Sequence, residues 1–249
     1  MKTIAVYNNK GGVSKTTTVI NVAYTLAETM NKKVLVVDCD GQQNISHFLS
    51  DLDMKKGIEE ILINGVSPDE VLTYSRYKNI DVLVSTSKMN DCCEVYKQLT
   101  KIKQKENLEM LYKFCLDCPY DYVLLDMPPA LNSITESMLS ITDGVIVPVE
   151  LGTFAIQGIA KVTETINKVG AAFMGCFISK FDKSNKSDEQ LKELLCNTLG
   201  NKVFDTVIPY SNIIRNSINY RMTAYEYMNW MEPSRKYCDL TEEILRRVG

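Results

Sequence analysis

The sequence predicts an open, mostly parallel, twisted α/β sheet with helices on both faces. Two observations predict it. Short runs rich in β-branched residues alternate with amphipathic segments along the chain, and several of the runs are continuously apolar, as in strands that are buried on both faces. Such alternation requires crossover connections, which place helices over a parallel sheet. With 249 residues, 45% of them hydrophobic, a single domain over residues 1–249 is expected.

The elements follow in order along the chain. A β-branched run at 3–8 leads into a glycine loop and then into a segment at 16–30 with apolar residues at helical spacing. Further strands are expected at 32–40, 80–86, 120–129, 143–150, 171–179 and 202–210. Helices are expected at about 92–116, 130–141, 154–168, 187–198 and 234–248. The segment 44–78 is expected to hold loops and short helices outside the sheet.

Composition limits the class of protein. No apolar run approaches the roughly 20 residues that span a bilayer, and the first residues do not resemble a secretory signal, so a cytosolic protein without membrane contact is expected. The eight cysteines are scattered, and Cys115 and Cys118 form the only close pair of metal-like spacing, which is too few ligands for a structural zinc site. A net charge of −3 and a pI near 5.4 do not indicate a nucleic-acid binder, although a local basic patch would suffice for one.

The stretch "YNNKGGVSKTTTVIN" at 7–21 indicates a phosphate-binding loop. The common pattern G-x-x-x-x-G-K-[ST] would require glycines where this chain has Asn9 and Ser14. Gly11 and Gly12 nevertheless allow the backbone to approach an anion, and the helix that follows directs its positive dipole end toward it. Lys15 would reach the β- and γ-phosphates, and the Thr16 hydroxyl would ligate Mg²⁺.

Two other predicted strands end in acids, Asp38 and Asp40 in "VVDCDGQ" and Asp126 in "VLLDMPP". An apolar strand that ends in aspartate is a usual place for a phosphate-bound magnesium ion. Taken singly, a Gly-Gly pair is often only a tight turn and such an aspartate only a helix cap. In this order along one sheet, the three elements together predict a nucleotide site beyond the carboxyl ends of the strands.

These motifs, with "VIVPVE", "FAIQGIAKVTETI" and "VFDTVIP", resemble the ParA/Soj family of partitioning ATPases within the wider ParA/MinD group. The resemblance is collinear from about residue 3 to 248, and it implies a P-loop NTPase with the deviant Walker A loop K-G-G-x-x-K-[ST]. It implies that Lys10 is the signature lysine, which reaches the nucleotide of the other subunit in a homodimer that holds two ATP molecules. The nucleotide-binding loop then comprises Lys10, Gly11, Gly12, Val13, Ser14, Lys15, Thr16 and Thr17.

The resemblance also assigns roles to the acids. Asp40 matches the position that orients or activates the attacking water, and Asp126 matches the acid that supports the magnesium shell, so Thr16, Asp40 and Asp126 are the expected metal site. Lys10, Lys15 and Asp40 are the expected catalytic residues. Asp38 is expected to help position Thr16 and the loop. Pro209 lies where relatives line the adenine site.

The chain departs from the family at several places. The family usually has Gly where this chain has Ser14, Pro at Gly41 and Thr at Met127. If the backbone at Ser14 requires a positive φ, serine costs about 1 kcal/mol or more there. Relatives also carry arginines after the "IP" of this segment, where this chain has Tyr210 and Ile213.

The resemblance implies a slow ATPase whose ATP-bound dimer binds nonspecific DNA in the nucleoid and is released when a ParB-like centromere-binding partner stimulates hydrolysis. Five of the six arginines fall in the last 35 residues, which indicates a possible basic surface for DNA phosphates. The alternative is that basic residues near the C-terminal end of a helix only complement its dipole and solvate the protein surface. The candidate DNA contacts are Arg215, Arg235 and Lys236.

Two other classes stay open. MinD-like positioning ATPases add an amphipathic membrane-targeting helix, whereas "YCDLTEEILRRVG" at 237–249 matches the last domain helix of the family. Iron-protein-like reductases have a cluster-binding cysteine shortly after the third strand-ending aspartate, where this chain reads "MPPA".

Overall fold

The computed structural model describes residues 1–51 and 55–248 and contains a seven-stranded sheet of order β3-β4-β2-β5-β1-β6-β7. The edge strand β3 (Leu72–Tyr74) runs antiparallel to β4, and the other pairings are parallel. These parallel strands are β1 (Lys2–Val6), β2 (Val34–Asp38), β4 (Ile80–Leu83), β5 (Tyr122–Asp126), β6 (Gly144–Glu150) and β7 (Phe173–Ser179). The predicted fold class is confirmed.

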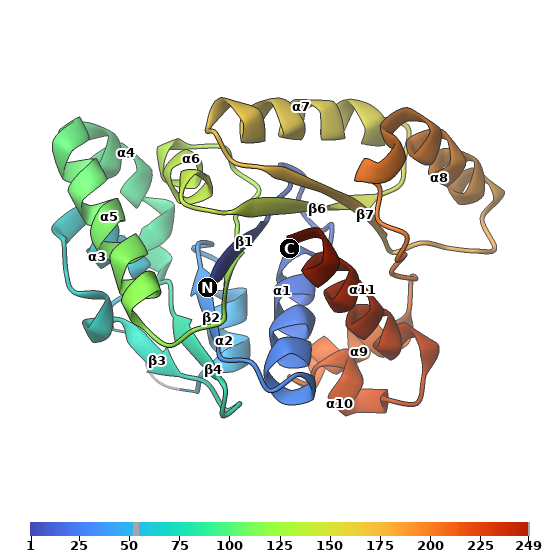
Figure 1. Cartoon of the computed structure of the whole chain (residues 1–249), viewed down its shortest axis with the longest axis horizontal. Coiled ribbons are helices and arrows are strands. Elements are labelled where there is room, and N and C mark those ends of the chain that lie inside the picture. The colour runs from blue at the N-terminus through green and yellow to red at the C-terminus, as the bar shows by residue number, and fades with distance from the viewer. Residues whose placement is uncertain (52–54, 249) are drawn as a thin grey trace.

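Helices cover both faces of this sheet (Figure 1). On one side lie α6 (Ser133–Ser140), α7 (Ala155–Lys168) and α8 (Lys186–Leu199). On the other lie α1 (Lys15–Tyr24), α2 (Asn44–Leu49), α9 (Asn212–Asn219), α10 (Ala224–Met228) and α11 (Glu232–Val248). At the left of the view are α3 (Ile58–Asn64), α4 (Cys92–Gln98) and α5 (Lys101–Asp117). The described residues also contain four short helical segments: a π-helix, η1 (Thr25–Thr29), and the 3₁₀-helices η2 (Pro68–Glu70), η3 (Ser87–Asn90) and η4 (Gly200–Lys202).

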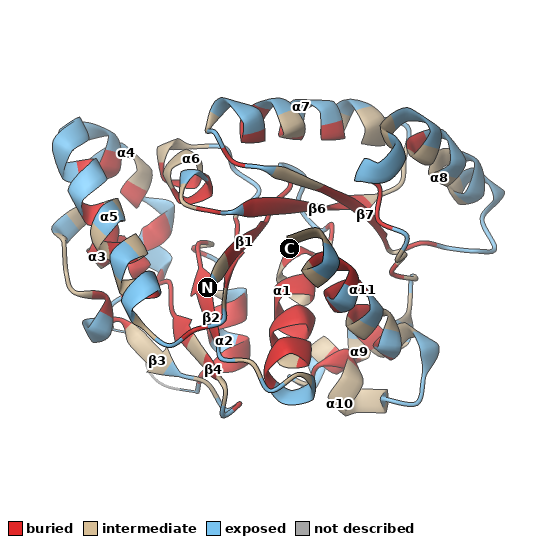
Figure 2. Ribbon diagram, in the orientation of Figure 1, coloured by how far each residue is buried: buried red, intermediate tan, exposed pale blue. Residues whose placement is uncertain are grey.

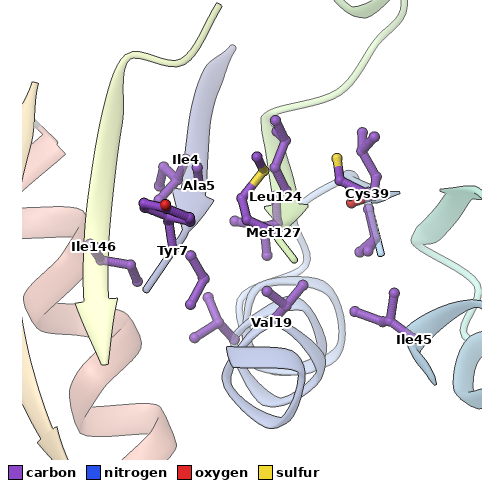
Figure 3. Packing of buried hydrophobic residues seen from close by; sticks show 14 of the residues in the cluster. Ile4, Ala5, Tyr7, Val19, Cys39, Ile45, Leu124, Met127 and Ile146 are labelled. Carbon is purple, nitrogen blue, oxygen red and sulfur yellow. Dashed lines mark hydrogen bonds between the residues drawn. The ribbon is translucent and has the colours of Figure 1, made fainter. Parts of the chain in front are cut away.

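The core lies on both faces of the central strands (Figure 2). All five residues of β2 are buried, as are the last four of β5, which is the burial expected of parallel strands covered twice. Val19 of α1 packs in the same cluster as Ile4 of β1 and Leu124 of β5 (Figure 3). This packing fixes the start of α1 directly beneath the ends of the strands.

The predicted strand at 202–210 is wrong. This segment makes two isolated bridges, one to β7 between Cys176 and Val203 and one just beyond β7 between Phe181 and Pro209. Between the bridges, the backbone N–H groups of Asp205 and Thr206 donate to the buried carboxylate of Glu243 on α11, at 2.8 and 2.9 Å. These two N–H groups therefore donate to a side chain, whereas in a strand they would be available to the backbone of a neighbouring strand.

Other boundaries also differ from the prediction. The expected helix at 92–116 is two helices, because Leu99 is extended and the Thr100 hydroxyl caps α5 by accepting a bond from the N–H of Lys103. The segment 44–78 contains the expected short helices and also strand β3; its residues 52–54, like residue 249, lie outside the described part of the chain. The helices α9 and α10 have no counterpart in the prediction.

Candidate functional site

Strand register places the predicted acids beside the glycine loop. In the sheet Asp38 pairs with Asp126, and Asp126 pairs with Val6, the last residue of β1. The loop from Tyr7 to Ser14 starts at this position and leads into α1. Because these strands are parallel, their carboxyl ends share one edge, so the three motifs meet there as predicted.

The loop itself is held open. Gly12 has φ 77°, and a Cβ on Gly11 or Gly12 would meet no atom within 4 Å, so the space above the loop is free for a ligand. The Asn8 amide donates to the carbonyl of Pro148 at 2.8 Å and its oxygen accepts from the N–H of Lys10. On the other side the buried Ser179 hydroxyl donates to the carbonyl of Val13 at 3.1 Å. The neighbouring strands thus fix a loop that contains few contacts of its own.

Ser14 has φ 74° and ψ 26°, which is the left-handed conformation. Its carbonyl accepts bonds from the N–H and the hydroxyl of Thr18, at 2.9 and 2.7 Å, and these bonds hold the residue in place at the start of α1. An L-residue with a Cβ costs about 1–2 kcal/mol in this conformation. The chain therefore carries strain where the family usually has glycine.

Lys15 opens α1 and is buried. Its ammonium donates to the carbonyl of Lys10 at 3.0 Å, across the mouth of the loop. Burial lowers the pKa of Lys15, and the carboxylates of Asp126 and Asp40 oppose that shift. Both acids therefore lie near enough to act on this ammonium, which is the convergence that the sequence predicted.

A hollow of about 380 Å³ lies above the loop. Predicted site residues line most of it, and three further residues, not predicted, complete the wall. Its lining comprises Gly11, Gly12, Ser14, Lys15, Thr16, Thr17, Asp40, Asn44, Pro129 and Lys180. The size and the backbone donors suit a chain of phosphates at a helix N-terminus.

Asp126 is fully buried, and neither of its carboxylate oxygens accepts a well-formed hydrogen bond among the described residues. Burial raises its pKa well above the usual range, and the Asp38 carboxylate adds to the shift; the nearby Thr16 hydroxyl and Lys15 ammonium act the other way. A buried carboxylate without partners is expensive unless a cation joins it. Together with the hydroxyl of Thr16, this orphaned group fits a magnesium ion, whose preferred ligands are oxygens.

Asp38 and Asp40 have separate environments. Asp38 is buried and accepts bonds from the N–H of Asp40 at 3.0 Å and from the N–H and hydroxyl of Ser46, at 3.1 and 2.5 Å. Burial raises the pKa of Asp38 to about 6, against the effect of these bonds. Asp40 is half-buried and lines the hollow, and its backbone carbonyl accepts from the Ser85 hydroxyl at 2.7 Å. The hydrogen bonds of Asp38 thus hold the turn that presents Asp40, whereas the sequence led us to expect a role at Thr16.

A second cleft, of about 290 Å³, adjoins the first and shares Ser14, Thr17 and Lys180 with it. Pro209 lines this cleft with apolar residues of α9 and the ring of Tyr237 on α11. A mostly apolar slot joined to a phosphate hollow has the form needed for a purine base. The sequence-based position of Pro209 beside the base is therefore consistent with the geometry.

Lys10 does not line the hollow above its own loop. It is exposed and borders a separate depression of about 230 Å³ with Glu150 and Phe154, whose ring is 74% exposed. Lys10 is therefore accessible from solvent.

The arginines near the end of the chain do not form one surface. Arg221 donates to the carbonyls of Phe48 and Ser50 at the end of α2, and Arg247 donates to the carbonyls of Asn201 and Val203. Part of the donor capacity of these two arginines is thus used within the chain.

Among the DNA candidates, Arg215 is exposed on α9 but also lines the second cleft. Arg235 is exposed and donates to the carbonyl of Asn229 at 3.2 Å, and Lys236 pairs with Asp239 at 3.0 Å.

Two departures from the family pattern have local explanations. The side chain of Met127 is fully buried in the core rather than turned to the site (Figure 3). A Cβ on Gly41 would lie 2.4 Å from the amide oxygen of Asn90, so Asn90 occupies the space that a proline ring would need.

Sequence reasoning missed Lys180, Ser46 and the anchoring residues Asn8 and Ser179. Lys180 and Ser179 end β7 at the same sheet edge as the predicted acids, so their place at a strand end was the available signal. Ser46 has no such signal, because only the fold of α2 brings it to Asp38.

Two further features of the structure concern metal sites and membrane-spanning helices. Within residues 1–51 and 55–248, no group of three or more His, Cys, Asp or Glu side chains is arranged to hold a metal. In the same residues, every helix is too short or too polar to cross a membrane.

The loop, the two strand-ending acids and the paired clefts define a P-loop nucleotide-binding protein on a parallel sheet. A family model described as an AAA domain matches residues 1–175. A chromosome-partitioning ATPase, Soj, from Thermus thermophilus is 30% identical over 255 residues, which cover 100% of this chain and 97% of that one. The chromosome partitioning protein ParA from Caulobacter vibrioides is 26% identical over 255 residues, covering 99% and 95%. The chain belongs to the ParA/MinD family of ATPases.

Solved structures share the fold at lower identity. The septum site-determining protein MinD from Pyrococcus horikoshii, complexed with Mg-ADP, superposes with a TM-score of 0.79 at 22% identity, covering 100% of this chain and 97% of that one. Cobyrinic acid a,c-diamide synthase from Mycobacterium smegmatis, with an ATP analogue and magnesium, gives 0.81 at 22% identity, covering 99% and 95%. At these identities the likeness establishes the fold alone.

Proposed function

We propose that this chain is a DNA-partitioning ATPase that binds ATP and Mg²⁺ as one domain over residues 1–249. The observation that carries the proposal is that Lys15, Thr16 and Asp40 line one hollow, while the buried Asp126 lies close enough to act on the Lys15 ammonium. The collinear likeness to Soj and ParA over nearly the whole chain supports the partitioning role.

Different residues of the two clefts bind different parts of the nucleotide. The N–H groups of Gly11 and Gly12 and the ammonium of Lys15 bind the phosphates, and Pro209 lies beside the base. Thr16 and Asp126 would hold magnesium, with Asp40 in reach of its water shell; the ion supplies Lewis-acid charge to the phosphate oxygens. Asp40 orients the water that attacks the γ-phosphate. Asp38 holds the turn that carries Asp40.

Lys10 makes dimerisation depend on nucleotide. It is exposed and lines a depression other than the hollow above its own loop, which is consistent with a contact to the phosphates of a second copy. A cation supplied across an interface neutralises the charge that develops in phosphoryl transfer, as an arginine finger does. ATP binding and dimerisation then become one linked equilibrium, which hydrolysis reverses.

The ATP-bound dimer binds DNA without sequence preference, and a ParB-like centromere-binding protein stimulates hydrolysis. Arg215, Arg235 and Lys236 are the proposed phosphate contacts, because a dimer doubles their number on one assembly. The protein would then be cytoplasmic and associated with the nucleoid.

The test is binding to random-sequence duplex DNA at low and moderate salt, with ATP, with ADP and without nucleotide. Wild type is compared with Lys10→Ala. We expect binding that requires both ATP and Lys10 and that weakens steeply with salt, because each neutralised phosphate releases a counterion. Absence of ATP-dependent binding at every salt concentration would refute the partitioning role while leaving the ATPase site untouched.

A further inference from the structure

Lys180 is the cation of the site that no motif identifies. It follows the last residue of β7, has φ 56°, and lines both the phosphate hollow and the base cleft. Ser14 and Thr17 are the other residues common to the two linings. A nucleotide with its terminal phosphates on the loop and its base in the second cleft must pass between these residues and Lys180.

In the described chain Lys180 is paired within the protein. Its ammonium lies 3.4 Å from a carboxylate oxygen of Glu150, the last residue of β6. Both side chains are more than a third exposed, at 38% and 36%, so the pair is weak and open to competition. Glu150 also borders the depression that contains Lys10.

We propose that Lys180 binds the α-phosphate of the nucleotide and that Glu150 competes for it when the site is empty. This inference rests on the proposed ATP function. The α-phosphate is the charged group that lies between the terminal phosphates and the base, which is where Lys180 stands between the two linings. A phosphate oxygen offers the ammonium a stronger, more buried partner than the exposed carboxylate.

The competition predicts opposite effects for the two partners of the pair. Loss of the ammonium removes a contact to the ligand, so affinity falls. Loss of the carboxylate charge frees the ammonium, so affinity rises. A pair with a purely structural role would shift affinity in the same direction whichever partner is changed.

The experiment is calorimetric titration of the full-length chain with Mg-ADP and then with Mg-ATP. The variants are Lys180→Met, Lys180→Arg and Glu150→Gln. Lys183→Met is the matched control, because Lys183 lies three residues away, is exposed and pairs with Glu232 outside both clefts. Circular dichroism and melting temperature establish that each variant is folded.

We expect Lys180→Met to weaken ADP binding about tenfold, Lys180→Arg to stay within about threefold of wild type, and Glu150→Gln to tighten binding about two- to threefold. Lys180→Met should weaken the binding of ATP and of ADP by the same factor, because both nucleotides have the α-phosphate. Lys183→Met should match wild type.

A Lys180→Met variant that binds ADP as wild type does would overturn the inference. A loss confined to ATP would also overturn it, because it would place the ammonium at the γ-phosphate. Weaker binding in Glu150→Gln would show that the pair has a structural role. If wild type binds neither nucleotide, the proposed function fails as well, so the two failures are distinguishable.

Discussion

Replacement of Asp126 by asparagine should stabilise the chain without ligand and abolish its response to magnesium nucleotide. Asp126 is fully buried, and neither carboxylate oxygen accepts a well-formed hydrogen bond among the described residues. An unsatisfied buried polar group costs about 1–3 kcal/mol. Asparagine keeps the shape without the charge but brings an amide that needs partners, so we expect a gain of about 1–2 kcal/mol at pH 8.

The sign of the pH dependence follows from the direction of the pKa shift. Burial raises the pKa of Asp126 above its unfolded value. The protonated form is therefore favoured in the folded state, and that stabilisation is present at low pH and lost as pH rises through the folded pKa. The advantage of Asp126→Asn should therefore be small in acid and grow with pH.

Thermal melts at several pH values measure this difference. For a chain of this length, each kcal/mol corresponds to about 2–4 °C, so the variant should melt about 2–8 °C higher at pH 8. With saturating Mg-ADP, wild type should melt at the higher temperature. A ligand at 100 times its dissociation constant stabilises the protein that binds it by about 2.7 kcal/mol, and we expect the variant not to bind. The exposed Asp91→Asn is the charge-matched control. A variant less stable than wild type at pH 8 would refute the reasoning.

The other predictions concern the loop and its neighbours. Ser14→Gly should raise the free energy of unfolding, measured in urea, by at most about 1 kcal/mol, because the relief of left-handed strain is partly offset by the greater backbone entropy of glycine in the unfolded chain. Ser14→Val should lower this free energy. Lys15→Ala should abolish ATP binding in calorimetry, and retained micromolar affinity would contradict its role. Lys10→Ala should bind ATP yet stay monomeric by light scattering, so an unchanged ATP-dependent dimer would remove Lys10 from the interface. Asp40→Ala should hold an ATP-bound dimer and release no phosphate; turnover at the wild-type rate would exclude Asp40 as the residue that orients water.

The sequence predicted the central parallel strands, but not the edge strand β3 or the irregular segment at 202–210. Continuous apolar runs are required wherever a strand is covered on both faces, so β2 and β5 were visible from composition alone. The segment 202–210 has the same apolar character but no ladder, because Glu243 on α11 takes the N–H groups of Asp205 and Thr206. The local sequence around Thr206 cannot indicate a hydrogen bond to Glu243, which lies 37 residues further along the chain.

A count of arginines is incomplete evidence for a related reason. Arg221 and Arg247 donate to backbone carbonyls at or just beyond the ends of α2 and η4, so part of their donor capacity is used within the chain. Backbone carbonyls at helix ends compete with a phosphate for the same guanidinium donors. The number of arginines therefore overstates the number of guanidinium donors that are free to bind a phosphate.

The two halves of the nucleotide site differ in how far sequence can specify them. Phosphate is recognised by backbone N–H groups and a fixed turn, which demand particular residues at particular spacings, so Gly11, Gly12 and Lys15 form a readable motif. A base is recognised by the shape of an apolar slot, which many side chains can supply, so the cleft that Pro209 and Tyr237 line has a weaker sequence signal: the resemblance indicated Pro209 but not Tyr237. Lys180 lies at the junction of the two clefts, and only the fold shows that a lysine just after β7 lines both of them.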